Sequence, residues 1–118
     1  MEFCDSDKIR AVRQAVRSFC ERELAPMARD IDRDNRFPWE VADKMGHLGY
    51  FGIQAPRGLG GAGMDTVAYV TIVEEVSRVC AAMGLCISVH NSVALFPLLH
   101  FGSAEQKQKW GPALATSK

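Results

Sequence analysis

Apolar residues recur at intervals of three and four along most of this chain, which places them on single faces of α-helices. No stretch alternates apolar and polar residues for long enough to predict a β-strand. The periodicity therefore predicts an all-α fold, a bundle of about five to six helices. The clearest stripes are Ile9, Val12, Val16, Phe19, Cys20 and Leu24 in one helix, and Tyr69, Ile72, Val73, Val76, Cys80 and Met83 in another.

Residues with known capping preferences mark several ends of these helices. Asp65 is expected to be an N-cap, and Ser103 with Gln106 is expected to form a capping box. Gly84 is expected to take the left-handed conformation that ends the second striped helix, and Gly102 to end the helix after it.

The length of 118 residues predicts one domain, residues 1–118, with one core. Fourteen Lys and Arg balance fourteen Asp and Glu, which argues against nucleic acid or a membrane surface as a partner. The segment 85–99 is apolar nearly all round, so it is expected to be the most buried helix. The longest apolar stretch, 85–101, is interrupted by polar residues. Its polar residues leave it short of the roughly 20 apolar residues that a membrane span needs.

The four cysteines, Cys4, Cys20, Cys80 and Cys86, contain no C-x-x-C pair and lie in apolar helical stretches. Reduced, buried thiols fit this pattern better than a disulfide framework does. The acidic start, residues 1–7, lacks the apolar run of a signal peptide. These features together predict a soluble intracellular protein.

The run Gly58-Leu59-Gly60-Gly61-Ala62-Gly63 matches the dinucleotide-binding pattern G-x-G-x-x-G. That reading requires a hydrophobic strand before the motif and an acidic residue about 20 positions after it. The preceding stretch 51–56 is broken by Gly and Pro, and no carboxylate stands at the required distance. The run is therefore interpreted as a packing turn between helices.

Cys86 and His90 are four residues apart on one helix, a spacing that occurs in metal sites and in thiol–imidazole pairs. A zinc site needs three or four ligands, and only Cys80 is near enough to suggest a third. A metal-binding bundle is kept as an alternative, but no metal ligand is predicted. Glu74 and Glu75 are interpreted as part of a solvated face.

The polar run Ser88, His90, Asn91 and Ser92 interrupts the most apolar helix. Buried polar groups need hydrogen-bond partners, so the run indicates an interhelical network, a wet cavity or a surface that another part of a larger protein covers. In the last case the helix faces a substrate, with Val89 and Val93 on the cavity side.

Taken in order, these stretches resemble one family, the amino-terminal helical domain of the acyl-CoA dehydrogenases, nearest the short- and branched-chain acyl types. The similarity runs from about residue 9 to the end. It is carried by Phe37-Pro38-Trp39, Leu48-Gly49-Tyr50-Phe51-Gly52, Gly60-Gly61-Ala62-Gly63, Val73-Glu74-Glu75-Val76-Ser77-Arg78, Val89-His90-Asn91-Ser92 and Phe101-Gly102-Ser103-Ala104-Glu105-Gln106-Lys107-Gln108-Lys109-Trp110.

The sequence departs from the family at two places. At Arg57-Gly58-Leu59 the family usually has an acidic pair and an aromatic residue, which leaves the packing of this loop open. Family members also continue into a middle β-domain and a carboxy-terminal helical domain, and both are absent from these 118 residues. Those domains hold most flavin contacts and the catalytic glutamate, so no catalytic residue is assigned here.

The resemblance implies an FAD-dependent oxidoreductase of fatty acid β-oxidation that oxidises the Cα–Cβ bond of an acyl-CoA. In that family a carboxylate removes the α proton while hydride leaves the β carbon for the flavin. The expected electron acceptor is an electron-transfer flavoprotein, and the full-length protein is expected to be a homo-oligomer, a tetramer. By motif position, the residues implied as one wall of the acyl pocket are Val89, His90, Val93 and Ala94.

This fragment is expected to be inactive and not to hold FAD by itself. The resemblance implies a bacterial cytoplasmic location, or the mitochondrial matrix if the source is eukaryotic. The alternative function is a stand-alone helical interaction module that has kept the fold and lost the catalysis.

Overall fold

The computed structural model describes residues 6–117, and throughout this range all the regular structure is helical. The expectations about residues 1–5, including Cys4, lie outside the described range. The helices are α1 (Asp7–Phe19), α2 (Ala28–Asp34), α3 (Trp39–His47), α4 (Thr66–Val79), α5 (Ala81–Val89), α6 (Phe96–Phe101) and α7 (Ala104–Thr116). Shorter pieces are the π-helical η1 (Cys20–Leu24) and η4 (His90–Leu95) and the 3₁₀ turns η2 (Ala25–Met27) and η3 (Arg57–Leu59).

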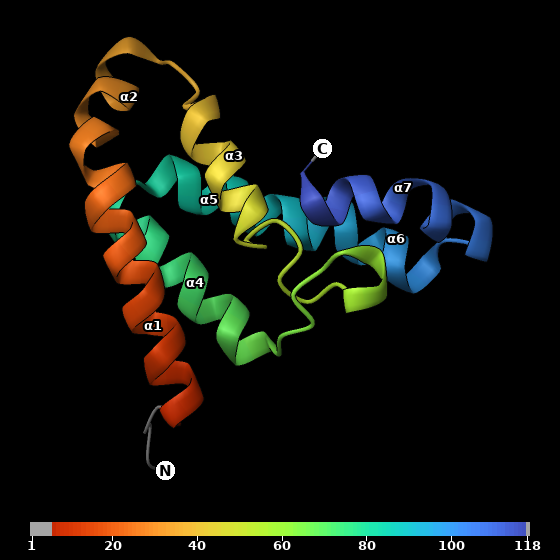
Figure 1. The fold of residues 1–118 in the computed structure, drawn as a ribbon. Coiled ribbons are helices and arrows are strands. Elements are labelled where there is room, and N and C mark those ends of the chain that lie inside the picture. Colours follow the sequence, from red (N-terminus) through yellow and green to blue (C-terminus); the bar gives the residue numbers. More distant parts are fainter. Residues whose placement is uncertain (1–5, 118) are drawn as a thin grey trace.

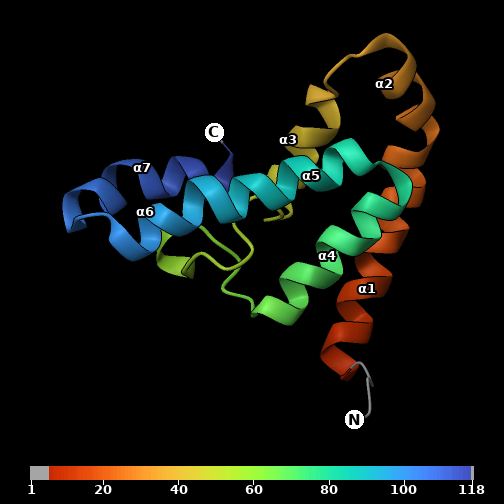
Figure 2. The same cartoon turned by 180° about the vertical axis from the view of Figure 1, so that it is seen from behind.

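Several of these pieces join end to end, so residues 6–117 form five continuous helices (Figure 1). Two of the five are joined from several pieces: one runs from α1 through η1 and η2 to α2, and the other runs from α5 through η4 to α6. The other three are α3, α4 and α7. The predicted all-α bundle of about five to six helices is therefore confirmed. α4 packs between α1 and α5, while α3 and α7 lie on the same side of the long α5–α6 helix (Figures 1 and 2).

Both π-helical pieces occur just before a proline. Pro26 follows η1 and Pro97 follows η4. A proline inside a helix has no N–H to donate, and its ring clashes with the carbonyl four residues earlier. A locally widened turn before the proline relieves that clash, which explains how the two long helices continue through these positions.

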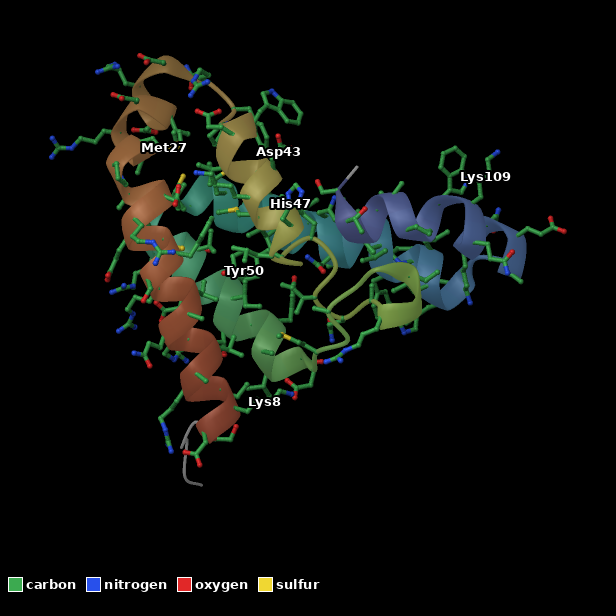
Figure 3. The ribbon with its side chains drawn as sticks, in the orientation of Figure 1. Lys8, Met27, Asp43, His47, Tyr50 and Lys109 are labelled. Atoms are coloured by element: carbon green, nitrogen blue, oxygen red, sulfur yellow. The ribbon has the colours of Figure 1, made fainter. Side chains whose placement is uncertain are left out.

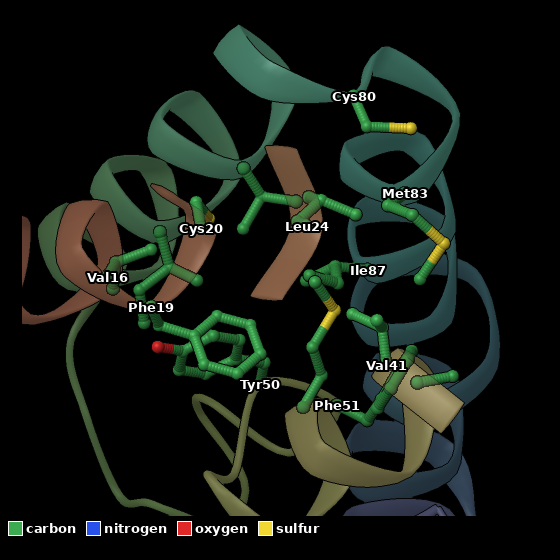
Figure 4. Close-up of a cluster of buried hydrophobic side chains, with 14 of the residues drawn as sticks. Val16, Phe19, Cys20, Leu24, Val41, Tyr50, Phe51, Cys80, Met83 and Ile87 are labelled. Carbon is green, nitrogen blue, oxygen red and sulfur yellow. The ribbon is translucent and has the colours of Figure 1, made fainter. Parts of the chain in front are cut away.

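The main core lies where α1, α3, α4 and α5 meet (Figure 4). Leu24, Met45, Val76 and Ile87 are each fully buried there. The ring of Phe19 meets the ring of Tyr50 edge to face, with 5.7 Å between their centres. Burial raises the pKa of the Cys20 thiol to about 11, so this cysteine acts as a small apolar residue, as the sequence predicted.

Three of the predicted helix ends are confirmed. The Asp65 carboxylate accepts a hydrogen bond from the amide of Ala68 at 2.9 Å, which makes Asp65 the N-cap of α4. Ser103 and Gln106 form the capping box of α7, and α6 ends at Gly102.

The expected role of Gly84 is wrong, because α4 ends at Val79, five residues before Gly84, and Gly84 lies inside α5. The chain turns between the two helices at Cys80, which has an extended conformation. A Cβ atom on Gly84 would lie 1.9 Å from Ser77 Oγ and 2.9 Å from Ser77 Cα. Glycine is therefore required by the close crossing of α4 and α5.

The expectation that 85–99 is the most buried helix is also wrong. Only 28% of the most apolar window of the joined helix Ala81–Phe101 is buried. One side of this helix packs into the core through Ile87 and Leu95, while large apolar residues on the other side are exposed. Composition alone does not reveal this asymmetry, since both sides are apolar.

Candidate functional site

Four large apolar side chains are exposed along one face of the joined α5–η4–α6 helix. Leu85 is 64% exposed, Val89 45%, Val93 67% and Phe96 46%. They are spaced by four, four and three residues, and we call them the apolar stripe. Val89 and Val93, both expected in a pocket wall, belong to it, and Ala94 beside Val93 is exposed as well. Leu85 and Phe96 were not predicted, although the same spacing rule could have identified them.

His90 is half-buried and turns away from the stripe toward α7. Its Nε2–H donates to the carbonyl oxygen of Leu114 at 2.7 Å, and its ring meets the ring of Phe51 edge to face. The Leu114 carbonyl is among the last four of α7, which have no partner within the helix. His90 therefore connects the joined α5–η4–α6 helix to the end of α7.

Asn91 connects the same helix to the loop before η3. It is 6% exposed, and its Oδ1 accepts a hydrogen bond from the amide of Ile53 at 3.1 Å. Its Nδ2 donates to the carbonyl oxygens of Tyr50 at 3.0 Å and Ile87 at 2.9 Å. The loop is thereby held against η4 by one fully satisfied amide side chain.

The two serines of the polar run also bond within the domain. The hydroxyl groups of Ser88 and Tyr69 lie 3.0 Å apart, in hydrogen-bond contact. Ser92 donates to the carbonyl oxygen of Ser88 at 2.7 Å. Of the three interpretations of this run, an interhelical network describes the observed contacts, and it positions the helix that carries the stripe.

Glu75 contradicts the expectation of a solvated face. Its side chain is 1% exposed, and its carboxylate accepts bonds from Arg13 Nη1 at 2.9 Å and from Arg17 Nε and Nη2 at 2.9 and 2.8 Å. Arg78 Nε lies 3.5 Å away. The hydrogen bonds from Arg17 are the main reason that the pKa of Glu75 lies below its usual value. Glu74, by contrast, is 59% exposed, as expected.

The glycine run does not form a phosphate cradle. A Cβ on Gly61 would lie 2.2 Å from the carbonyl oxygen of Ala55, so the loop's own backbone fills the space above it. The stretch before the run is a series of bends and turns. The interpretation as a packing turn is confirmed, and this loop leaves no space above Gly61 for a pyrophosphate.

The described residues 6–117 contain no group of three His, Cys, Asp or Glu that could hold a metal ion. His90 Nε2 is bonded to Leu114, and burial raises the pKa of the Cys86 thiol, which disfavours its thiolate form. Lys8 on α1 and Lys109 on α7 lie on different arms of the molecule (Figure 3).

Two hollows lie near the helices. A groove of about 590 Å³ separates α2 from the corner between α4 and α5. A smaller hollow of about 370 Å³ adjoins the stripe at Phe96 and is lined opposite by Gln54 and Met64. Neither hollow could be predicted from the sequence, because each is lined by segments distant along the chain.

Comparison with known proteins identifies this arrangement. The family model described as "Acyl-CoA dehydrogenase, N-terminal domain" matches residues 6–118. The chain belongs to the acyl-CoA dehydrogenase family. The mouse (Mus musculus) mitochondrial short-chain specific acyl-CoA dehydrogenase is 48% identical over 99 residues, 84% of this chain and 24% of that protein. An acyl-CoA dehydrogenase of Bacillus subtilis is 44% identical over 105 residues, 89% of this chain and 28% of that protein.

Among solved structures, a glutaryl-coenzyme A dehydrogenase in complex with glutaryl-CoA superposes with a TM-score of 0.91 and 31% identity. The alignment covers 99% of this chain and 30% of that one. This acyl-CoA dehydrogenase domain therefore spans 24% to 30% of the length of these relatives.

The joined helix Ala81–Phe101 of this acyl-CoA dehydrogenase domain has 21 residues and a mean hydropathy of 1.6 in its most apolar window. By length and composition alone it could cross a membrane. The expectation that this segment is too short for a membrane span is therefore wrong, because the helix begins at residue 81 and not at residue 85. Core helices of soluble proteins pass the same test. Here Ile87, Asn91 and Leu95 pack against other helices and loops of the domain.

Proposed function

We propose that this chain is the amino-terminal part of an FAD-dependent enzyme that oxidises the Cα–Cβ bond of acyl-CoA thioesters. The observation that carries the proposal is the apolar stripe, an exposed hydrocarbon surface on a helix that polar contacts hold in place on its other sides. Exposed apolar surface of this extent is typical of a binding site or of an interface with another part of a larger protein.

The share of this chain in the reaction is one wall of the acyl pocket. Val89, Val93 and Ala94 present hydrocarbon toward the acyl chain, and Leu85 extends the wall by one turn. His90 serves as a positioning residue, since its Nε2 is bonded to Leu114. FAD supplies the oxidising power when bound; most of its contacts and the catalytic carboxylate belong to the β-domain and the second helical domain of the full-length protein.

The remaining expectations are part of the same proposal. The full-length protein is a homotetramer that passes electrons to an electron-transfer flavoprotein. Relatives occur both in bacteria and in mitochondria, so the location is the bacterial cytoplasm or the mitochondrial matrix, depending on the source.

The first test is the intact mass and the visible absorption spectrum of the protein produced from its native gene. A product several times longer than 118 residues, with the absorption of bound flavin near 450 nm and bleaching on addition of an acyl-CoA, supports the proposal. A flavin-free product of 13.0 kDa would contradict it. That result would favour the stand-alone interaction module, whose partner would cover the apolar stripe.

A further inference from the structure

The groove between α2 and the corner of α4 and α5 is lined largely by apolar residues. Its volume of about 590 Å³ lies within the range of small-molecule sites. Ile31, Pro38 and Met83 are buried lining residues, and Val79 and Phe37 add accessible apolar surface. α2 and the α4–α5 corner lie at the same end of the molecule (Figure 2). Among the described residues that line the groove, none belongs to the apolar stripe.

Four polar side chains also line this groove: Arg29, Asp32, Asn35 and Arg36. Arg36 is paired with Glu40. Arg29 and Asp32 are both exposed, and within residues 6–117 neither forms a hydrogen bond or an ion pair. The groove therefore presents one free cation and one free anion from the described part of the chain.

The order of these two charges along α2 explains why they do not neutralise each other. Residues three positions apart on a helix lie on the same face, with Cβ atoms about 5–6 Å apart, and an acid that precedes the base gives the better pair. Asp30 precedes Arg33 and bonds to it at 3.0 Å, and Arg33 also bonds to Asp34 at 2.7 Å. Arg29 precedes Asp32, which is the less favourable order.

A ligand that matches this arrangement has an anion, a cation and an apolar group close together. An α-amino acid at about pH 7 has this form, because its ionised carboxylate, its ammonium group and its side chain are all attached to one carbon. A carboxylate accepts two parallel N–H···O bonds from a guanidinium group. An apolar side chain gains from leaving water for the apolar lining.

We propose that the groove binds a free α-amino acid with a large apolar side chain. Arg29 binds the carboxylate, Asp32 accepts bonds from the ammonium group, and the side chain lies against Ile31, Val79 and Met83. A fatty acid would leave Asp32 unpaired, and an amine would leave Arg29 unpaired. The proposal uses none of the residues of the apolar stripe, so it stands independently of the proposed function.

The test is saturation-transfer NMR, which detects weak ligands of large proteins, on the protein produced from its native gene. Leucine is expected to bind with a Kd of about 1 mM, because both ion pairs remain exposed to water. Three probes each lack one part of the ligand: isocaproate lacks the ammonium group, isoamylamine lacks the carboxylate, and glycine lacks the side chain. Each is expected to bind to the groove at least about fivefold more weakly than leucine.

Matched variants locate the binding in the groove. Arg29→Gln and Asp32→Asn each remove one charge at an exposed position, and each is expected to weaken leucine binding at least about fivefold. Arg33→Gln is the control, because Arg33 lies on the same helix but is paired within it and does not line the groove. This variant should keep the Kd of the native protein. Circular dichroism checks that all three variants fold.

Weaker leucine binding in both charge variants, with an unchanged Kd in Arg33→Gln, supports the proposal. Absence of saturation transfer at about 20 mM leucine, well above the expected Kd, overturns it. Equal affinity for leucine and glycine, or binding that Arg29→Gln and Asp32→Asn leave unchanged, overturns it as well. None of these measurements depends on flavin or on acyl-CoA oxidation, so the result is separate from the outcome for the proposed function.

Discussion

Replacing Glu75 with glutamine tests whether the buried carboxylate joins α1 to α4. The substitution keeps the size of the side chain but exchanges a charged acceptor for a neutral amide facing arginine donors. Three bonds to Arg13 and Arg17 lose their charge assistance. At about 1 kcal/mol for each bond, the expected loss is about 3 kcal/mol in the free energy of unfolding.

The neighbouring Glu74→Gln is the matched control. Glu74 is 59% exposed and makes one bond, to Arg13 at 2.8 Å, so its replacement is expected to cost less than about 0.5 kcal/mol. For a chain of 118 residues the unfolding entropy is about 0.25 kcal/mol per kelvin, so Glu75→Gln should lower Tm by about 12 °C. The corresponding shift for Glu74→Gln is under about 2 °C.

The assay is urea and thermal unfolding of the 118-residue chain, followed by circular dichroism at 222 nm. The pH dependence gives a second readout. Because the folded-state pKa of Glu75 is lowered, its contribution is present above the unfolded pKa of about 4.5 and is lost as the pH falls through the folded pKa. The difference between the native chain and Glu75→Gln should therefore shrink in acid. Equal losses for the two glutamine variants, or a difference that does not change with pH, would refute the reasoning.

Three further predictions follow from the packing and from the stripe. Gly84→Ala should lower stability by about 2 kcal/mol despite the better helix propensity of alanine, because its Cβ would meet Ser77; Gly58→Ala, with nothing within 4 Å, should be neutral in the same unfolding assay. A Gly84→Ala chain as stable as the Gly58→Ala control would count against the close helix crossing. Val93→Phe in the full-length enzyme should shift the preference toward shorter acyl chains, as measured by kcat/KM across chain lengths; an unchanged profile would remove Val93 from the wall. The 118-residue chain alone should self-associate through the exposed stripe, with a concentration-dependent mass in analytical ultracentrifugation. A monomer at high concentration, or self-association that Val93→Glu leaves intact, would argue against this.

Much of the fold could be predicted from local patterns. The spacing of apolar residues gave the all-α class, and the caps at Asp65 and Ser103 were correct because a capping residue bonds to amides only two or three positions away. The family followed from motifs, since their order along the chain is a property of the sequence itself.

The sequence by itself thus determined the helices, several of their ends and the family. Only the tertiary structure decided which apolar faces are covered and which charges are buried. Glu75 is buried because its arginine partners approach from 58 and 62 residues away. Gly84 is required because the backbone of Ser77 on another helix crosses there. Apolar residues of the segment 85–96 lie on nearly every side of the helix, yet one side contacts the core and the other is exposed. Periodicity reports how residues are arranged around one helix axis, whereas burial depends on neighbours that folding brings from distant parts of the chain.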